Sequence, residues 1–125
     1  MLKLNVDKAF CISLHEAEDR RKLLTTEFNK IGLDVEYFLV DRMPNPQLGC
    51  SLSHQSVILL AQQQNYERVL IFEDDVRFYD FDPNQIAQVN NFLETNTTWE
   101  LFYLGGILGR MWKTGHKGIC RIRCA

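Results

Sequence analysis

The chain has 125 residues, of which 46% are hydrophobic and 24% are charged, and its formal net charge is -2. These values are typical of one ordinary globular domain and exclude a disordered or low-complexity chain. Neither a run of roughly 20 apolar residues nor the apolar core of a secretion signal is present, so we expect a cytoplasmic protein with a single domain over residues 1–125 and no transmembrane segment.

The first part of the chain predicts a strand, a helix and a second strand. Residues 9–14 form a short apolar run. Residues 19–31 carry apolar side chains at helical spacing and end at Gly32, where a left-handed helix cap fits. Residues 35–40 predict the second strand. Residues 41–48 contain two prolines and predict a loop.

A second helix and a third strand are expected next. Either Ser51 or Ser53 can cap a helix that runs to about Gln64. Residues 68–72 predict the third strand, and the apolar run at residues 69–72 suits a strand that is covered on both faces.

A third helix and a fourth strand are expected after these. Asp82 can cap a helix over residues 82–94 with Pro83 at its first position. Residues 100–104 predict a fourth strand, followed by Gly105. Strands that alternate with helices predict an α/β fold, with a mostly parallel sheet and helices on both faces.

Three consecutive carboxylates, Glu73, Asp74 and Asp75, follow the third strand. Ligands of open α/β sheets bind outside the carboxyl ends of the strands. In an extended segment Glu73 and Asp75 would point to one side and Asp74 to the other. Two carboxylates together with substrate phosphates suit Mg²⁺ or Mn²⁺, although a solvated acidic loop is the alternative. A phospho-receiver pocket is not supported, because the first strand ends in Ser13-Leu14-His15 rather than in acids.

Five motifs occur in a characteristic order along the chain. They are Ser13-Leu14 with Asp19-Arg20-Arg21, Val40-Asp41, Gly49-Cys50-Ser51-Leu52-Ser53-His54, Phe72-Glu73-Asp74-Asp75, and Leu101-Phe102-Tyr103-Leu104-Gly105. The specific signal is the pairing of Gly-Cys-x-x-Ser-His with the later Glu-Asp-Asp. Together these motifs resemble glycosyltransferase family 25, the lipopolysaccharide-biosynthesis type, to which the collagen galactosyltransferase domains also belong.

The resemblance implies a Rossmann-like nucleotide-sugar-binding domain of GT-A type, of which this chain contains the N-terminal, donor-binding half. The Glu-Asp-Asp triplet would act as a DxD-like motif, with Glu73, Asp74 and Asp75 holding Mn²⁺ or Mg²⁺ against the diphosphate of a UDP-sugar. The remaining nucleotide-site residues implied by the family are Leu14, Arg20, Asp41, His54 and Gly105. The expected activity is transfer of a sugar, with galactose the expected one, to a lipooligosaccharide or another glycan.

Whether this chain is itself an enzyme stays open at this point. Domains of the family are longer, and the acceptor half with its general base has no counterpart here. The alternative is a truncated, catalytically inactive remnant that binds UDP and a divalent metal without transfer. A nucleophilic pair of Cys50 and His54 lacks a third orienting group. Arg20 could equally be an exposed helix arginine, and Asp41 an ordinary turn residue.

The charge is unevenly distributed. From Arg110 onward there are five cations and no acid, whereas the preceding residues carry a net charge of -7. A basic tail could contact an anionic membrane surface peripherally, or it could be a solvated strand pair. His116, Cys120 and Cys124 could bind zinc if that segment were helical, although it reads better as a strand. No nucleic-acid partner is expected.

Overall fold

The structure, a computed structural model, describes residues 3–79, 82–105, 108–116 and 119–124. The chain divides into two compact units, residues 1–79 and 80–125. Among the described residues, each helix is too short or too polar to cross a bilayer.

The first unit is built on a three-stranded parallel sheet. Its strands are β1 (Lys8–Leu14), β2 (Glu36–Val40) and β3 (Val69–Glu73), in the order β2-β1-β3. Ile12 of β1 lies opposite Phe38 of β2 and Glu73 of β3. The predicted α/β class and the parallel pairing are therefore confirmed for three strands.

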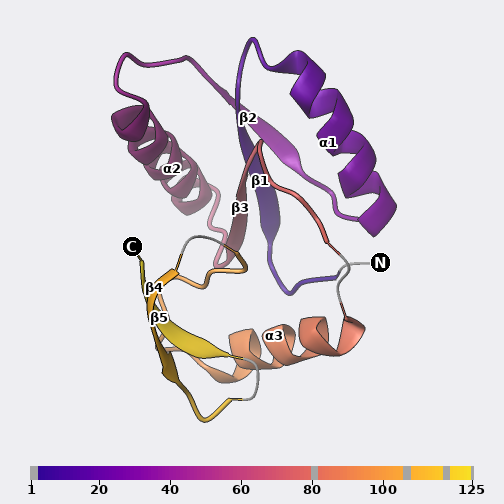
Figure 1. Cartoon of the computed structure of the whole chain (residues 1–125), viewed down its shortest axis with the longest axis vertical. Coiled ribbons are helices and arrows are strands. Elements are labelled where there is room, and N and C mark those ends of the chain that lie inside the picture. Colours follow the sequence, from indigo (N-terminus) through magenta and orange to yellow (C-terminus); the bar gives the residue numbers. More distant parts are fainter. Residues whose placement is uncertain (1–2, 80–81, 106–107, 117–118, 125) are drawn as a thin grey trace. The chain divides into compact units, whose positions relative to one another are not determined.

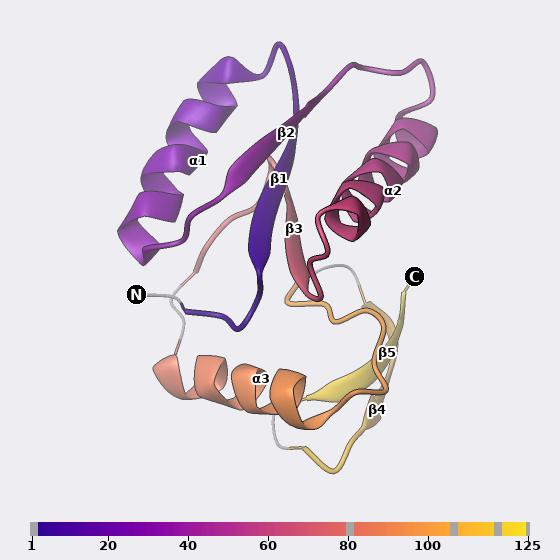
Figure 2. The same cartoon turned by 180° about the vertical axis from the view of Figure 1, so that it is seen from behind.

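Helices α1 (Glu18–Ile31) and α2 (Pro46–Gln63) cover opposite faces of this sheet (Figures 1 and 2). Side chains of a strand alternate between its faces, so neighbours on β1 pack against different helices. Phe10 packs with Val57 of α2. The next residue, Cys11, packs with Leu24 and Phe28 of α1. Burial on both faces explains why the central strand is almost continuously apolar.

Helix α1 ends where the sequence predicts. Gly32 adopts φ 70° and its amide bonds to the carbonyls of Phe28 and Asn29. A side chain would be strained in this left-handed conformation, which is why glycine suits the position.

Helix α2 begins earlier than predicted. The expected loop is confirmed for residues 41–45, but its extension to residue 48 and the expected helix start at Ser51 or Ser53 are wrong, because the helix starts at Pro46. The side chain of Asn45 accepts hydrogen bonds from the amides of Gln47 and Leu48, at 3.1 and 3.2 Å. Proline has no amide hydrogen to satisfy at the first helical position, so Pro46 starts this helix and does not interrupt it.

The second unit contains α3 (Pro83–Thr95) and a hairpin of β4 (Leu108–Lys113) with β5 (Cys120–Cys124). The predicted cap is confirmed, since Asp82 accepts from the amide of Asn84 at 2.9 Å. β5 is an antiparallel strand, so Cys120 and Cys124 do not lie on the helix that a zinc site with His116 required.

The fourth strand predicted at residues 100–104 is wrong, since this segment has no regular structure. Phe102 packs in a local aromatic cluster instead, whereas Leu101, Tyr103 and Leu104 are exposed. The ring of Phe102 lies 5.3 Å from that of Phe92 on α3 and 6.2 Å from that of Trp99, measured between centroids. Aromatic packing of this kind covers an apolar side chain without strand pairing.

Candidate functional site

Polar and charged side chains collect at one edge of the sheet in the first unit. Because β1, β2 and β3 are parallel, their carboxyl ends meet at that edge. Leu14 is the last residue of β1, Asp41 follows β2, and the Glu-Asp-Asp triplet begins at the last residue of β3.

Asp74 is held by two partners. The Ser13 hydroxyl donates to its Oδ2 at 2.8 Å, and the Arg20 Nη1 donates to its Oδ1 at 2.9 Å. The Asp74 side chain is only 14% exposed, whereas that of Arg20 is 55% exposed. The hydrogen bond and the charge of Asp74 raise the pKa of Arg20 above its usual value. Arg20 therefore lies at the predicted edge of the sheet, where its guanidinium bonds to the Asp74 carboxylate.

Glu73 faces the opposite side of the sheet from Asp74, toward α2. Its Oε1 accepts from the thiol of Cys50 at 3.2 Å and lies 3.1 Å from Nε2 of His54. The hydrogen bond to Glu73, then burial and the negative charges of Glu73 and Asp75, raise the pKa of the Cys50 thiol. A thiol that keeps its proton is a poor nucleophile, which disfavours the Cys50–His54 nucleophilic pair.

Asp75 lies in a turn and not in an extended segment. β3 ends at Glu73, and the amide of Val76 bonds to the Glu73 carbonyl at 3.1 Å across Asp74 and Asp75. The predicted alternation of side-chain direction is therefore confirmed for Glu73 and Asp74, but it does not extend to Asp75. Asp75 is exposed, and across residues 3–79 the structure shows no hydrogen bond or ion pair to its carboxylate.

The edge also contains residues that the sequence reasoning missed. Nδ1 of His15 lies 3.0 Å from Oδ1 of Asp41, and both side chains are exposed. Arg21 donates to the Ser13 hydroxyl at 3.1 Å, to the His15 carbonyl at 3.0 Å and to the Leu14 carbonyl. Arg21 thus holds the loop that follows β1. The only sequence signal for it is the paired arginine motif, which draws attention first to Arg20.

Gly105 belongs to the second unit, whereas the other predicted site residues belong to the first. A Cβ atom added there would meet no other atom within 4 Å, so close packing does not require glycine at this position. Its role at a nucleotide site stays a prediction.

The donor groups at the edge fit a hard divalent cation in part. Glu73 and Asp75 are exposed carboxylates, which suit Mn²⁺ or Mg²⁺. Asp74 fits this role less well, because each of its oxygens already accepts a hydrogen bond. Asp74 fits better as the group that fixes the turn to β1 and α1.

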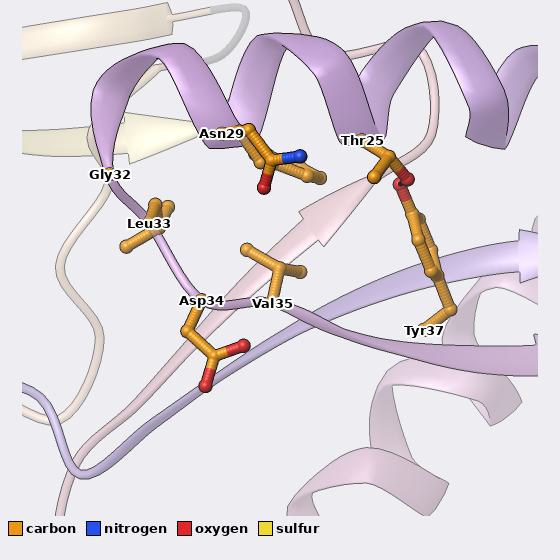
Figure 3. Close-up of a pocket in the computed structure, with 8 residues that line it drawn as sticks. Thr25, Asn29, Gly32, Leu33, Asp34, Val35 and Tyr37 are labelled. Carbon is orange, nitrogen blue, oxygen red and sulfur yellow. Dashed lines mark hydrogen bonds between the residues drawn. The ribbon is translucent and has the colours of Figure 1, made fainter.

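A cavity of about 400 Å³ lies elsewhere, between α1 and the amino end of β2 (Figure 3). Asp34 and Val35 line it beside Thr25, whose hydroxyl lies 2.9 Å from that of Tyr37. None of the predicted site residues lines this cavity. It is at the end of the parallel sheet opposite the carboxylate triplet, so it is not the site that the strand ends form.

Comparison with known proteins finds relatives of one kind. The chain is similar to a glycosyltransferase 25 family member of Aedes aegypti, with 28% identity over 82% of this chain, and to human procollagen galactosyltransferase 2, with 26% identity over 84%. It is also similar to the mouse inactive glycosyltransferase 25 family member 3, with 29% identity over 72% of this chain. These matches cover 22%, 18% and 16% of the relatives, so the chain spans about a fifth of their length. No solved structure gives a significant match.

The family model described as glycosyltransferase family 25 (LPS biosynthesis protein) matches residues 39–125. This range includes Asp41, the Gly-Cys-x-x-Ser-His motif at the start of α2 and the carboxylate triplet after β3. The resemblance inferred from these motifs is confirmed: the chain belongs to glycosyltransferase family 25.

Proposed function

We propose that the sheet edge at the ends of β1, β2 and β3 binds the diphosphate of a UDP-sugar together with Mn²⁺ or Mg²⁺, in a GT-A-type fold. One observation carries this proposal. Exposed carboxylates at Glu73 and Asp75 lie at the carboxyl edge of a parallel sheet, where α/β proteins bind their ligands, in a chain of a glycosyltransferase family.

Each carboxylate of the triplet has a separate task in this proposal. Asp75 is the first ligand of the cation, and Glu73 contributes to the cation or to the ribose. Asp74 positions the turn through Ser13 and Arg20. A divalent cation supplies positive charge that stabilises the leaving diphosphate. The repulsion between Glu73 and Asp75 is itself a reason for the chain to bind a cation there.

The nucleoside lies beside the loop after β1 and the end of β2. Asp41, next to His15, offers an acceptor for a ribose or uracil group. Leu14 ends β1 at the same edge. His54 acts on the site through its contact with Glu73.

The reaction that we propose is transfer of a hexose, with galactose the favoured one, to a glycan such as a lipooligosaccharide. The name of the human relative, procollagen galactosyltransferase 2, supports galactose. The family description, LPS biosynthesis protein, supports the lipooligosaccharide acceptor.

The alternative is binding of UDP and metal without transfer, and the mouse relative named inactive supports it. A peripheral contact of the cations from Arg110 onward with a membrane stays a prediction.

A calorimetric titration of UDP into the chain, with and without Mn²⁺, tests the donor site. We expect binding that depends on Mn²⁺ and that weakens by about tenfold or more in Asp75→Asn, because one charged cation ligand is lost. Asp34→Asn is the matched control, since Asp34 is an exposed aspartate at the opposite end of the sheet. Unchanged affinity in Asp75→Asn, or binding that does not need a divalent cation, would contradict the proposal.

A second assay separates transfer from binding alone. UDP release from UDP-galactose is measured with and without a lipooligosaccharide acceptor. Acceptor-dependent release supports the transferase, whereas tight Mn²⁺-dependent UDP binding with no release supports the binding alternative.

A further inference from the structure

We propose that Cys50, His54 and Glu73 form a binding site for a transition-metal ion of the zinc class. This inference goes beyond the proposed function and does not rest on it, because metal binding here needs neither nucleotide nor acceptor. The two sites share Glu73, so an ion held by Cys50 and His54 and a cation held with UDP would compete for its carboxylate.

The backbone brings the three side chains together from two elements. Cys50 and His54 are four residues apart on α2, so they share one face of the helix. Glu73 is the last residue of β3, on the face of the sheet that α2 covers. Asn45 caps the start of α2 and the Ser53 hydroxyl bonds to the Gly49 carbonyl at 2.8 Å, which orders the turns that carry the two helix ligands.

The distances are close to those of a coordinated ion. The Cys50 sulfur, a His54 ring nitrogen and a Glu73 oxygen all lie within 4.8 Å of one another. Oε1 of Glu73 is 3.2 Å from the sulfur and 3.1 Å from Nε2 of His54. Tetrahedral zinc, with bonds of about 2.3 Å to sulfur and about 2.0 Å to nitrogen and oxygen, separates its ligand atoms by roughly 3.3–3.5 Å. The two distances from Glu73 are within a few tenths of an ångström of these values, whereas the Cys50 sulfur and the His54 nitrogen, which lie within 4.8 Å of each other, would move closer together around an ion.

The ligand types select the ion. Mg²⁺ and Ca²⁺ take oxygen ligands, whereas sulfur and imidazole favour Zn²⁺ and similar ions. Three protein ligands leave a fourth coordination position for water, as in catalytic zinc sites. Cys50 and Glu73 are exposed and His54 is partly exposed, so an ion can reach the cluster from solvent.

The competing explanation is a hydrogen-bonded cluster without metal affinity. In that case the Cys50 thiol and the His54 ring simply donate to Glu73 and orient its carboxylate. An entering ion would have to displace the thiol proton and the proton on Nε2, because both donors must become ligands. The two explanations differ in one measurable property, which is affinity for a thiophilic divalent ion.

Titration of the reduced, metal-free chain with Co²⁺, followed by absorption spectroscopy, tests the site. We expect one Co²⁺ per chain with a thiolate-to-cobalt charge-transfer band, and displacement of Co²⁺ by Zn²⁺. Cys50→Ala should lose that band. His54→Gln should keep thiolate coordination but weaken Zn²⁺ binding by about 100-fold or more, since loss of outer-shell groups alone costs roughly 10- to 100-fold.

The double variant Cys120→Ser, Cys124→Ser is the matched control, because it removes two other thiols and leaves the cluster intact. Cys11 is fully buried in β1 and offers no accessible ligand. Circular dichroism of each variant confirms that it folds.

Absence of the charge-transfer band in the unaltered chain, or its persistence in Cys50→Ala, would overturn the proposal. So would its loss in the Cys120/Cys124 control. The titrations with UDP and Mn²⁺ are made without Zn²⁺ or Co²⁺, and their variant, Asp75→Asn, leaves Cys50, His54 and Glu73 unchanged, so failure of one proposal does not imply failure of the other.

Discussion

Two adjacent aspartates at the end of β3 have different environments although their side chains are identical. Asp74 is largely buried and accepts from Ser13 and Arg20. Asp75 is exposed in the turn that the Val76 amide closes. The backbone thus divides the triplet into a positioning carboxylate and a carboxylate that is accessible to a ligand.

The carboxylates of the triplet also influence the buried thiol of Cys11. Its side chain is completely buried in β1. Burial, and after it the charges of Asp74, Asp75 and Glu73, raise the pKa of the Cys11 thiol to about 12. Ionisation is therefore strongly disfavoured in the folded chain, and Cys11 should be inert to thiol reagents.

This pKa predicts a loss of stability in alkali. An unfolded Cys11 thiol ionises near its ordinary value of 9.0, whereas the folded one retains its proton to about 12. Between these values the folded state binds more protons, so the free energy of unfolding falls as pH rises, by at most about 1.4 kcal/mol per pH unit from this group. Below the ordinary value the contribution is fully present.

Urea unfolding at several values between about pH 8 and pH 10.5 measures this slope. Cys11→Ala is the comparison, because it lowers stability at every pH but removes the Cys11 titration. The curves of the two proteins should converge as pH rises. Parallel curves would show that Cys11 does not have the raised pKa.

At the scale of the elements, the start of α2 determines where two functional side chains lie. Cys50 and His54 project from the first turns of this helix, and its first amides bond to the side chain of Asn45. Without a cap, those amides would have to find other partners. The cap therefore contributes both to stability and to the placement of the cluster.

Asn45→Ala should lower the free energy of unfolding by about 1 kcal/mol, since the capping hydrogen bonds are lost. Asn45→Ser should retain most of the stability, because serine also caps helices well. Gln55→Ala, at an exposed position within α2, is the control and should change stability by less than about 0.5 kcal/mol. Urea unfolding of the three variants provides the measurement. Equal stability of Asn45→Ala and Gln55→Ala would contradict the role of the cap.

Local sequence signals succeeded for some elements and failed for others. Gly32 and Asp82 were predicted correctly, because a helix end depends on a few neighbouring residues. The prolines predict a loop that includes Pro46, but Pro46 starts α2, because proline is also common at the first helical position. The strand predicted at residues 100–104 does not form, because a short apolar run does not reveal whether its partners are strands or aromatic rings.

At the scale of the whole molecule, the two units differ in how their strands are supported. In the first unit β1 is paired on both sides and covered by a helix on each face. In the second unit β4 and β5 pair only with each other among the described residues. Isolated two-stranded hairpins are marginally stable, whereas a central buried strand is opened only by global unfolding.

Hydrogen exchange should therefore be slowest in residues 9–12 of β1, which are all buried and lie between two strands. The amides of β4 and β5 should exchange faster by about tenfold or more. Mass spectrometry of peptides from the intact chain can compare them directly. Equal protection of the hairpin and β1 would show that both units unfold in one cooperative step.

The sequence by itself determined the family, the parallel strands β1 to β3, and the presence of Glu73, Asp74 and Asp75 at a carboxyl edge. These features follow from motif order and from periodicities that act over short stretches of chain. The tertiary structure decided how the three acids are used. Asp74 meets Ser13 and Arg20 from β1 and α1, while Glu73 meets Cys50 and His54 from α2. Such partners are far apart in sequence and are brought together only because the two helices pack on opposite faces of one sheet.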